Sequence, residues 1–291
     1  MLLVPSVKKT RGTGHLKRCM RLLDAIDTAR IFVPSGRDEW NAEEVRRMFP
    51  EVKPWRIVER RDNYHGRVII FDNFATSRTE YKRLASGCKS IGIDEGGPAR
   101  GLFDYLIDTF PRLSSKFPAN VDDERLVADG PAFPPRRVYH LRRVLLSFGG
   151  EDPAGLTGIT LSAIIKSGLI DPDNVDVVVG PAFRKEPTYW GGRILRGLSD
   201  IRPLFREYDA VFTSFGITAY EAERAGVLPV LVNPTRYHSK LAIRAGFHSI
   251  GERVISPRLL RDIVLYPLAP RDRGEPEKSL ADIIKGVDFA E

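Results

Sequence analysis

Three short segments of the chain combine glycine with hydroxyl or ionisable side chains, and each follows an apolar run. They are Gly12-Thr13-Gly14-His15, residues 147–152 and residues 214–221. Glycine lets the backbone come close to a ligand, and the free amides at the start of a helix attract anions such as phosphates. Histidine titrates near neutral pH and can act there as a general base. These segments therefore predict ligand-binding loops.

The first segment places His15 between the first predicted strand and the first predicted helix. Gly12 and Gly14 precede it, and Arg18 follows within one helical turn. Because open α/β sheets bind ligands at the carboxyl ends of their strands, His15 is placed to act as a base. The alternative is that His15 caps the helix or hydrogen-bonds a carbonyl group. The segment lacks the phosphate-binding motif GxxxxGK(S/T), and Lys17 occupies the third glycine position of the dinucleotide motif GxGxxG.

The second segment carries small residues directly after an apolar run. Ser147, Gly149 and Gly150 would let the backbone approach a ligand. A tight turn followed by the start of a helix accounts for the same pattern. The sequence leaves both interpretations open.

The third segment places Gly216 and Thr218 where a helix is predicted to begin. A glycine and a hydroxyl there can hold a diphosphate, and the carboxylate of Glu221, one turn later, can accept hydrogen bonds from ribose hydroxyls. The alternative is a capping box, in which Thr218 caps the helix and Glu221 bonds back to the start of the helix.

Further polar residues follow other predicted strands. Asp72 and Asp94 each stand at the end of an apolar run, where they either face a ligand or cap the next element. Tyr237-His238 follows the last predicted strand, where it either contacts a sugar or nucleotide or forms a solvated helix start. The histidines lack the HxH and HExxH spacings of metal sites, so neither a metal nor a cofactor is expected.

Apolar runs of strand length alternate with stretches of helical periodicity, which favours α/β architecture with parallel sheets and crossover helices. The predicted strands are 2–7, 30–35, 67–72, 90–94, 104–108, 143–150, 175–180, 210–216 and 228–233. Helices are expected after the first loop, after Thr76, and at 156–167, 200–207, 217–226 and 237–246, with a surface loop over 267–280 before a last short helix. Residues 110–143 hold five of the 21 prolines and show no sustained period. This places a domain boundary there and predicts two α/β domains, residues 1–135 and 136–291.

Charge, cysteine content and the length of the apolar runs limit which partners and which cellular location are expected. The formal net charge of +7 invites a nucleic-acid role, but the basic residues are spread over both halves without a basic tail. That distribution suits a protein that binds small anions, so no nucleic-acid partner is expected. Two cysteines are too few for a disulfide scaffold. No apolar run approaches the roughly 18 residues that span a bilayer, and the first residues do not form a secretory signal, so we expect a cytoplasmic protein without membrane insertion. The oligomeric state is not predicted.

The order of these segments resembles a known family. GTGHLKRC, FDNF, GIDEGGPARGLFDYLID, LLSFGGEDPAGLT and TSFGITAYEAERAGVLPVLV together are similar to the nucleotide-sugar hydrolase of pseudaminic acid biosynthesis and its spore-coat polysaccharide relatives, over about residues 10–246. The resemblance implies a GT-B-like fold, similar to the lipid II N-acetylglucosaminyltransferase, with two Rossmann-like domains facing each other across a cleft. It implies that the first domain acts on the sugar and that the second binds the nucleotide.

The resemblance also implies roles for particular residues. His15 matches the histidine that activates water at the anomeric carbon of a UDP-linked sugar, with Gly12, Gly14 and Arg18 in register. Glu221 matches the carboxylate that binds the ribose.

The chain departs from the family pattern near the sugar and the diphosphate. Phe215 and Ile217 replace a glycine and a hydroxyl residue, Tyr237-His238 replaces an Asn-Gln pair, and Phe74 replaces a tyrosine. Hydrolysis of a nucleotide-activated sugar is the leading hypothesis. Transfer of the sugar to an acceptor hydroxyl and non-catalytic binding of a nucleotide sugar are the alternatives.

Overall fold

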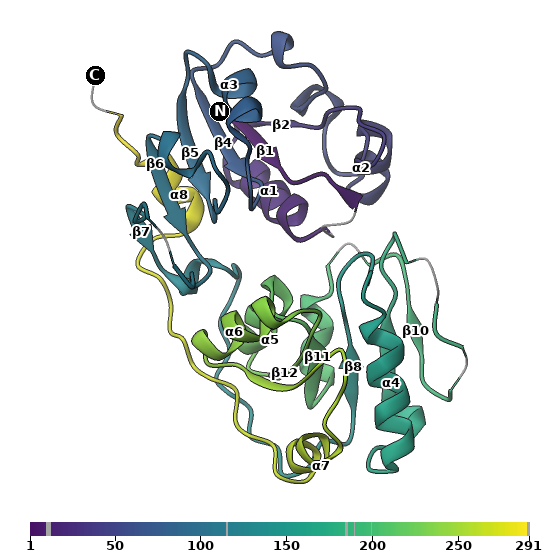
Figure 1. Cartoon of the computed structure of the whole chain (residues 1–291). Coiled ribbons are helices and arrows are strands. Elements are labelled where there is room, and N and C mark those ends of the chain that lie inside the picture. The colour runs from purple at the N-terminus through teal and green to yellow at the C-terminus, as the bar shows by residue number, and fades with distance from the viewer. Residues whose placement is uncertain (10–12, 115, 184–185, 189, 199, 290–291) are drawn as a thin grey trace. The chain divides into compact units, whose positions relative to one another are not determined.

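The computed structural model describes residues 1–9, 13–114, 116–183, 186–188, 190–198 and 200–289. Two compact units make up the chain (Figure 1). Unit 1 comprises Met1–Leu126 and Pro276–Glu291, and unit 2 comprises Val127–Glu275. No helix in these described ranges combines the length and the apolar character needed to cross a membrane.

Unit 1 contains a parallel sheet of seven strands in the order β3-β2-β1-β4-β5-β6-β7. The strands are β1 (Leu2–Pro5), β2 (Arg30–Phe32), β3 (Ile57–Val58), β4 (Val68–Asp72), β5 (Lys89–Ile93), β6 (Tyr105–Asp108) and β7 (Val121–Asp122). The helices are α1 (Gly14–Ala25), α2 (Ala42–Met48), α3 (Arg78–Ala85) and α8 (Leu280–Lys285).

Unit 2 contains a parallel sheet of six strands in the order β10-β9-β8-β11-β12-β13. The strands are β8 (Val144–Leu146), β9 (Val175–Val178), β10 (Ile194–Leu195), β11 (Ala210–Thr213), β12 (Leu228–Asn233) and β13 (His248–Glu252). The helices are α4 (Leu156–Ser167), α5 (Ile217–Arg224), α6 (Arg236–Arg244) and α7 (Pro257–Leu265).

Both sheets follow the strand order of the Rossmann fold. Counted within each unit, the first six strands run 3-2-1-4-5-6, so the order reverses between β1 and β4 in unit 1 and between β8 and β11 in unit 2. Ligands of doubly wound sheets bind at the carboxyl ends of the strands on either side of this reversal. The predicted loops that contain His15, Gly149 and Gly216 follow β1, β8 and β11, and Asp72 is the last residue of β4.

The central strands are buried on both faces. All four residues of β1 and all six of β12 are buried, as parallel strands covered by helices require. Leu2, Ile69 and Phe71 in unit 1 are fully enclosed, as are Val144 and Phe212 in unit 2. These apolar runs produced the strand predictions.

All nine predicted strands are confirmed, as are the helices at α1, α3, α4, α5, α6 and α8. The stretch predicted as a helix at 200–207 forms the 3-10 helix Arg202–Glu207, with Pro203 near its start. The sequence did not predict the edge strands β3, β7, β10 and β13 or the helices α2 and α7. Three of these edge strands have two residues each, too few for a periodic pattern.

The C-terminal residues belong to the first unit. The sequence assigned residues 136–291 to the second domain, whereas contacts group Val127–Glu275 in unit 2 and return Pro276–Glu291 to unit 1. The reason is that α8 packs against α1 and buries Leu280 and Ile284. An amphipathic helix does not show in its sequence which unit it covers, so sequence order alone misplaced it.

Candidate active site

Helix α1 is capped by a side chain at its C-terminal end, whereas its N-cap residue supplies no side-chain cap. Its N-cap residue, Thr13, makes no side-chain hydrogen bond to the helix, although α2, α3 and α8 in the same unit are each capped by a side chain. At the C-terminal end, Arg56 donates to the carbonyl oxygens of Leu23 (2.8 Å) and Ile26 (2.9 Å). A cation there complements the negative end of the helix dipole.

His15, in the first turn of α1, contacts the carboxylate at the end of β4. Its Nδ1 lies 2.5 Å from Oδ1 of Asp72. The Asp72 side chain is fully buried, whereas 18% of the His15 side chain remains exposed. The histidine is therefore fixed on one side of its ring and accessible to solvent.

Arg18 binds the same carboxylate. Its Nε donates to Oδ2 of Asp72 (2.8 Å) and its Nη2 to Oδ1 (2.6 Å), a bidentate pair of the kind that orients a carboxylate. Burial alone would raise the pKa of Asp72, but the charges of Arg18 and His15 hold it well below its ordinary value. Asp72 is thus ionised at neutral pH.

The ionised Asp72 decides which nitrogen of His15 carries the proton. A carboxylate can only accept hydrogen bonds, so Nδ1 of His15 must be the donor. In a neutral imidazole the other nitrogen, Nε2, then has a free lone pair. This is the arrangement of a histidine general base oriented by a carboxylate.

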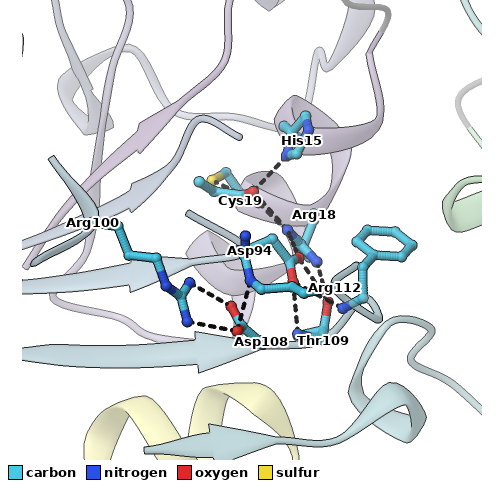
Figure 2. A network of polar contacts seen from close by, with 10 residues as sticks. His15, Arg18, Cys19, Asp94, Arg100, Asp108, Thr109 and Arg112 are labelled. Carbon is cyan, nitrogen blue, oxygen red and sulfur yellow. Dashed lines mark hydrogen bonds and ion pairs between the residues drawn. The ribbon is translucent and has the colours of Figure 1, made fainter. Parts of the chain in front are cut away.

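Asp94 and Thr109 complete the network around Arg18 (Figure 2). Oδ2 of Asp94 lies 2.7 Å from Nη2 of Arg18, and the Thr109 hydroxyl accepts from Nη1 at 2.8 Å. The Asp94 carboxylate also accepts a hydrogen bond from the Thr109 amide (2.6 Å). The backbone of Asp94 has a φ of +52°. A left-handed φ at a non-glycine residue costs free energy, here in the loop that aims Asp94 at Arg18.

A second ion cluster anchors the neighbouring strand end. Arg100 donates to both oxygens of Asp108 (2.9 and 2.7 Å), and Nε of Arg112 lies 2.7 Å from Oδ2 of the same residue. Figure 2 shows this cluster beside Thr109. Because Asp108 ends β6 and directly precedes Thr109, the pair with Arg100 stabilises the strand end that supports the Arg18 network.

Cys19 is a structural member of the site. It is fully buried, and its Sγ lies 3.8 Å from Oδ2 of Asp72. Burial, followed by the charge of Asp72, raises the pKa of the thiol, so it remains protonated. A protonated, enclosed thiol is a poor nucleophile.

Phe74 combines an unusual backbone with an exposed ring. Phe74 lies two residues after Asp72, its φ is +54°, and the residue is 44% exposed. The Gly96 amide donates to the Phe74 carbonyl (2.7 Å). The buried Glu95 carboxylate accepts from the amide of Thr76 (2.9 Å) and from its hydroxyl (2.5 Å). These bonds hold the loop in a conformation that presents an aromatic ring to solvent.

In unit 2 the loop after β8 supplies the side-chain cap of α4, the helix that follows it. Both oxygens of Asp152 accept from the first amides of α4, those of Leu156 and Thr157, at 2.8 Å each. Ser147 is buried, and Gly150 packs against Gly180 so closely that a Cβ on Gly180 would lie 2.5 Å from it. Of the three predicted residues here, Gly149 is the exposed one.

The start of α5 has no side-chain cap. Gly216 is its N-cap in an extended conformation, and a Cβ built on Gly216 meets nothing within 4 Å. Thr218 is the second helical residue, so the capping box proposed for Thr218 and Glu221 does not form. The other helices of unit 2 are capped by Asp152, Thr235 and Ser256.

Glu221 and His238 are both engaged within unit 2. Glu221 is 6% exposed on α5, and its charge acts on Arg202. His238 lies in the first turn of α6, where its Nδ1 is 2.8 Å from the hydroxyl of the capping residue Thr235. Burial lowers the pKa of His238, which favours the neutral imidazole at pH 7.

Phe215 packs inward. It is 8% exposed, its amide donates to Oδ1 of Asn233 (2.9 Å), and its ring contacts Tyr220 and Phe247 at centroid distances of 6.1 and 6.2 Å. The aromatic ring that replaces a glycine of the family pattern therefore belongs to the core beneath α5.

The predicted residues thus fall into two groups. His15, Arg18, Asp72 and Asp94 form one bonded network in unit 1, and Gly14 is the first residue of α1. The residues predicted in unit 2 lie near the carboxyl ends of β8, β11 and β12. Gly12 lies outside the described residues. Sequence reasoning missed Thr109, although it directly follows the predicted strand 104–108 and Asp72 and Asp94 likewise stand at the ends of predicted strands.

No family model matches the chain. An uncharacterized protein of Methanocaldococcus jannaschii is 31% identical, over a region that covers 60% of this chain and 42% of that protein. The chain therefore spans less than half the length of this relative.

Solved structures similar to this chain include proteins described as a rhamnosyltransferase and a UDP-N-acetylglucosamine 2-epimerase. They include spinosyn rhamnosyltransferase SpnG with thymidine diphosphate (14% identity, 91% of this chain and 89% of that one, TM-score 0.53). Acinetobacter baumannii MurG is also similar, with 14% identity over 90% of this chain and 88% of that one and a TM-score of 0.52. Arabidopsis thaliana UGT89C1 with UDP-L-rhamnose has 12% identity over 91% of this chain and 88% of that one and a TM-score of 0.53. At these identities the likeness shows the fold: two Rossmann-like parallel-sheet domains of the GT-B type.

Proposed function

We propose that this protein hydrolyses a nucleotide-activated sugar, with His15 as the general base and unit 2 as the nucleotide-binding unit. The observation that carries the proposal is the 2.5 Å contact between His15 and the buried Asp72 at the start of α1, where the N-cap residue Thr13 makes no side-chain cap. In each sheet the strand order reverses at one point, and doubly wound folds bind ligands there. Helices α1 and α5, whose N-cap residues make no side-chain cap, begin at these points.

In this reaction Nε2 of His15 takes a proton from water while the water oxygen attacks the anomeric carbon. The bond between that carbon and the diphosphate oxygen breaks, and the diphosphate leaves with the bonding electrons. The imidazolium that forms is stabilised by the ionised Asp72, which stays unprotonated. The sugar and the nucleotide are the products.

The start of α5 supports nucleotide binding in unit 2. Its N-cap residue is Gly216, which has no side chain to bond the first amides, and a Cβ built on Gly216 meets no protein atom within 4 Å, which favours an anion at this position. SpnG and UGT89C1 were solved with thymidine diphosphate and UDP-L-rhamnose, which supports a nucleoside diphosphate, and the family resemblance favours UDP.

Transfer of the sugar to an acceptor hydroxyl is the second candidate. The similar structures SpnG and MurG favour it, and the same base would deprotonate an acceptor hydroxyl instead of water. Non-catalytic binding is the third candidate. It rests on the altered Phe215-Ile217 and Tyr237-His238 positions, and the inward packing of the Phe215 ring bears only on the first of them.

The test is release of free nucleotide from a panel of UDP-, CMP- and GDP-sugars by the wild type, His15→Ala and His65→Ala. His65 is an exposed histidine of the same unit and serves as the matched control. If the protein is a hydrolase, nucleotide is released without an acceptor. The rate of release should then fall about 10²- to 10⁴-fold in His15→Ala and stay unchanged in His65→Ala. Release that requires an acceptor would establish transfer. A rise in melting temperature with UDP but no turnover would leave only binding.

A further inference from the structure

The last segment of unit 2 contacts the end of α6 and also α5, the helix that we assign to nucleotide binding. This segment, residues 267–275, has no helix or strand and is called the strap below. Two of its arginines reach the end of α6: Nη1 of Arg271 and Nη2 of Arg273 donate to the Ala245 carbonyl at 3.2 and 3.0 Å. Gly246, with a φ of +71°, admits Arg271, because a Cβ there would collide with the guanidinium.

Arg273 makes the central contacts of the strap. Its Nε donates to Oε2 of Glu223 on α5 at 2.5 Å. The planar guanidinium lies 4.7 Å from the ring centroids of both Tyr220 and Phe247. The Arg273 side chain is 19% exposed and that of Glu223 is 4% exposed, so the pair is largely removed from water.

Glu223 depends on this cation. Burial raises its pKa, and the charge and hydrogen bond of Arg273 oppose that rise, with further help from Arg271. A buried carboxylate that loses its partner must take up a proton or move toward water. Either response would disturb α5, since Glu223 lies on that helix.

The rings under Arg273 lead directly to the start of α5. The ring centroids of Tyr220 and Phe247 are 4.8 Å apart, and both rings contact the ring of Phe215, the residue before Gly216. Arg273 therefore lies at one end of an aromatic cluster, and the backbone that begins α5 lies at the other.

We propose that Arg273 is a positioning residue for nucleotide binding: through Glu223, Tyr220 and Phe247 it sets the position of the first turn of α5. The inference rests on the proposed function, because it assumes that the nucleotide binds at that turn. It assigns a positioning role to a side chain of the strap, which follows α7.

The test compares Arg273→Lys, Arg273→Met and Arg273→Ala with Arg258→Ala, a control on α7 whose arginine side chain is 89% exposed. UDP affinity is measured by calorimetry at a temperature where circular dichroism shows every variant folded. We expect Kd to rise about tenfold in Arg273→Met and Arg273→Ala, to rise less in Arg273→Lys, which keeps the charge, and to stay unchanged in Arg258→Ala. In turnover, KM for the nucleotide sugar rises while kcat at saturation is retained.

A purely structural role would lower the melting temperature and leave Kd unchanged in the folded variants, and that result overturns the inference. Amide hydrogen exchange gives a second readout. We expect faster exchange at 217–220 in Arg273→Met and unchanged exchange in α4. If the wild type itself binds no nucleotide, the proposed function fails together with the inference. If the wild type binds and the Arg273 variants bind equally well, the inference alone fails.

Discussion

The imidazole of His15 lies 2.5 Å from the carboxylate of Asp72, although 57 positions separate the two residues in the chain. The contact forms because β1 and β4 are neighbours in the sheet and both end at the same edge. His15 follows the first of these strands and Asp72 is the last residue of the second. The bidentate pair with Arg18 then fixes the carboxylate that orients the ring.

Asp72→Asn should slow nucleotide release about 10²- to 10⁴-fold. The amide keeps the shape of the side chain but loses the charge that stabilises an imidazolium on His15. Initial rates at saturating nucleotide sugar give the measurement, and Asp104→Asn is the control. Asp104 binds Ser90 in the same unit and lies outside the His15 network, so kcat should be retained there. Equal losses of kcat in both variants would show a general effect of folding.

Asp72 should also make the stability of unit 1 depend on pH in one direction. Its pKa is lower in the folded state, so its ionised form stabilises the fold fully above the unfolded pKa of about 3.9. That contribution is lost progressively as the pH falls toward the folded pKa. Urea unfolding of the wild type and Asp72→Asn should therefore show a difference in the free energy of unfolding that shrinks as the pH falls below about 4. A difference that is the same at pH 3 and pH 7 would contradict the depressed pKa.

Gly216→Ala should weaken nucleotide binding without affecting folding. A Cβ at Gly216 meets no protein atom within 4 Å, and its extended backbone suits alanine, so the melting temperature should be unchanged. A diphosphate at the start of α5 would meet the added methyl group, and Kd for UDP should rise. Gly158→Ala is the control, because this glycine lies inside α4, also in open space, and the substitution should stabilise the helix by about 1 kcal/mol without changing Kd.

Phe74→Gly and Phe74→Ala separate the ring of Phe74 from its backbone. Both variants remove the exposed ring, but only glycine accepts a φ of +54° without strain. Glycine should therefore be more stable than alanine by about 1 kcal/mol in urea unfolding. If the ring contacts the sugar, both variants should raise KM for the nucleotide sugar to the same extent while Kd for UDP is retained. A normal KM in both variants would remove Phe74 from the site.

Ile284→Ala should destabilise unit 1 and spare unit 2. Ile284 is 1% exposed on α8, which packs against α1, and truncating such a side chain costs about 2–5 kcal/mol. Hydrogen exchange should increase in α1 and β1 and stay unchanged in α5 and β12. Equal increases in both sets of elements would contradict the grouping of the C-terminal residues with unit 1.

The sequence predicted most of the fold because buried parallel strands are local patterns. Residues 68–71 and 228–232 are apolar throughout, and a strand covered on both faces needs that composition wherever it lies. The short edge strands β3, β7 and β10 leave no such pattern. Helix α2 begins with a capping box, so its start is marked in the sequence by Asn41 and, three positions later, Glu44.

The sequence by itself determined the two α/β halves, the loops at the strand ends and His15 as the candidate base, because residue type and short spacing carry that information. Only the tertiary structure decided which groups meet: Asp72 with His15, Thr109 and Asp94 with Arg18, Arg273 with Glu223, and α8 with α1. It also showed that Phe215 packs inward and that Asp152 occupies the start of α4. These are contacts between residues distant in the chain or choices of side-chain direction, and they depend on how strands pair and helices pack, which no local pattern records.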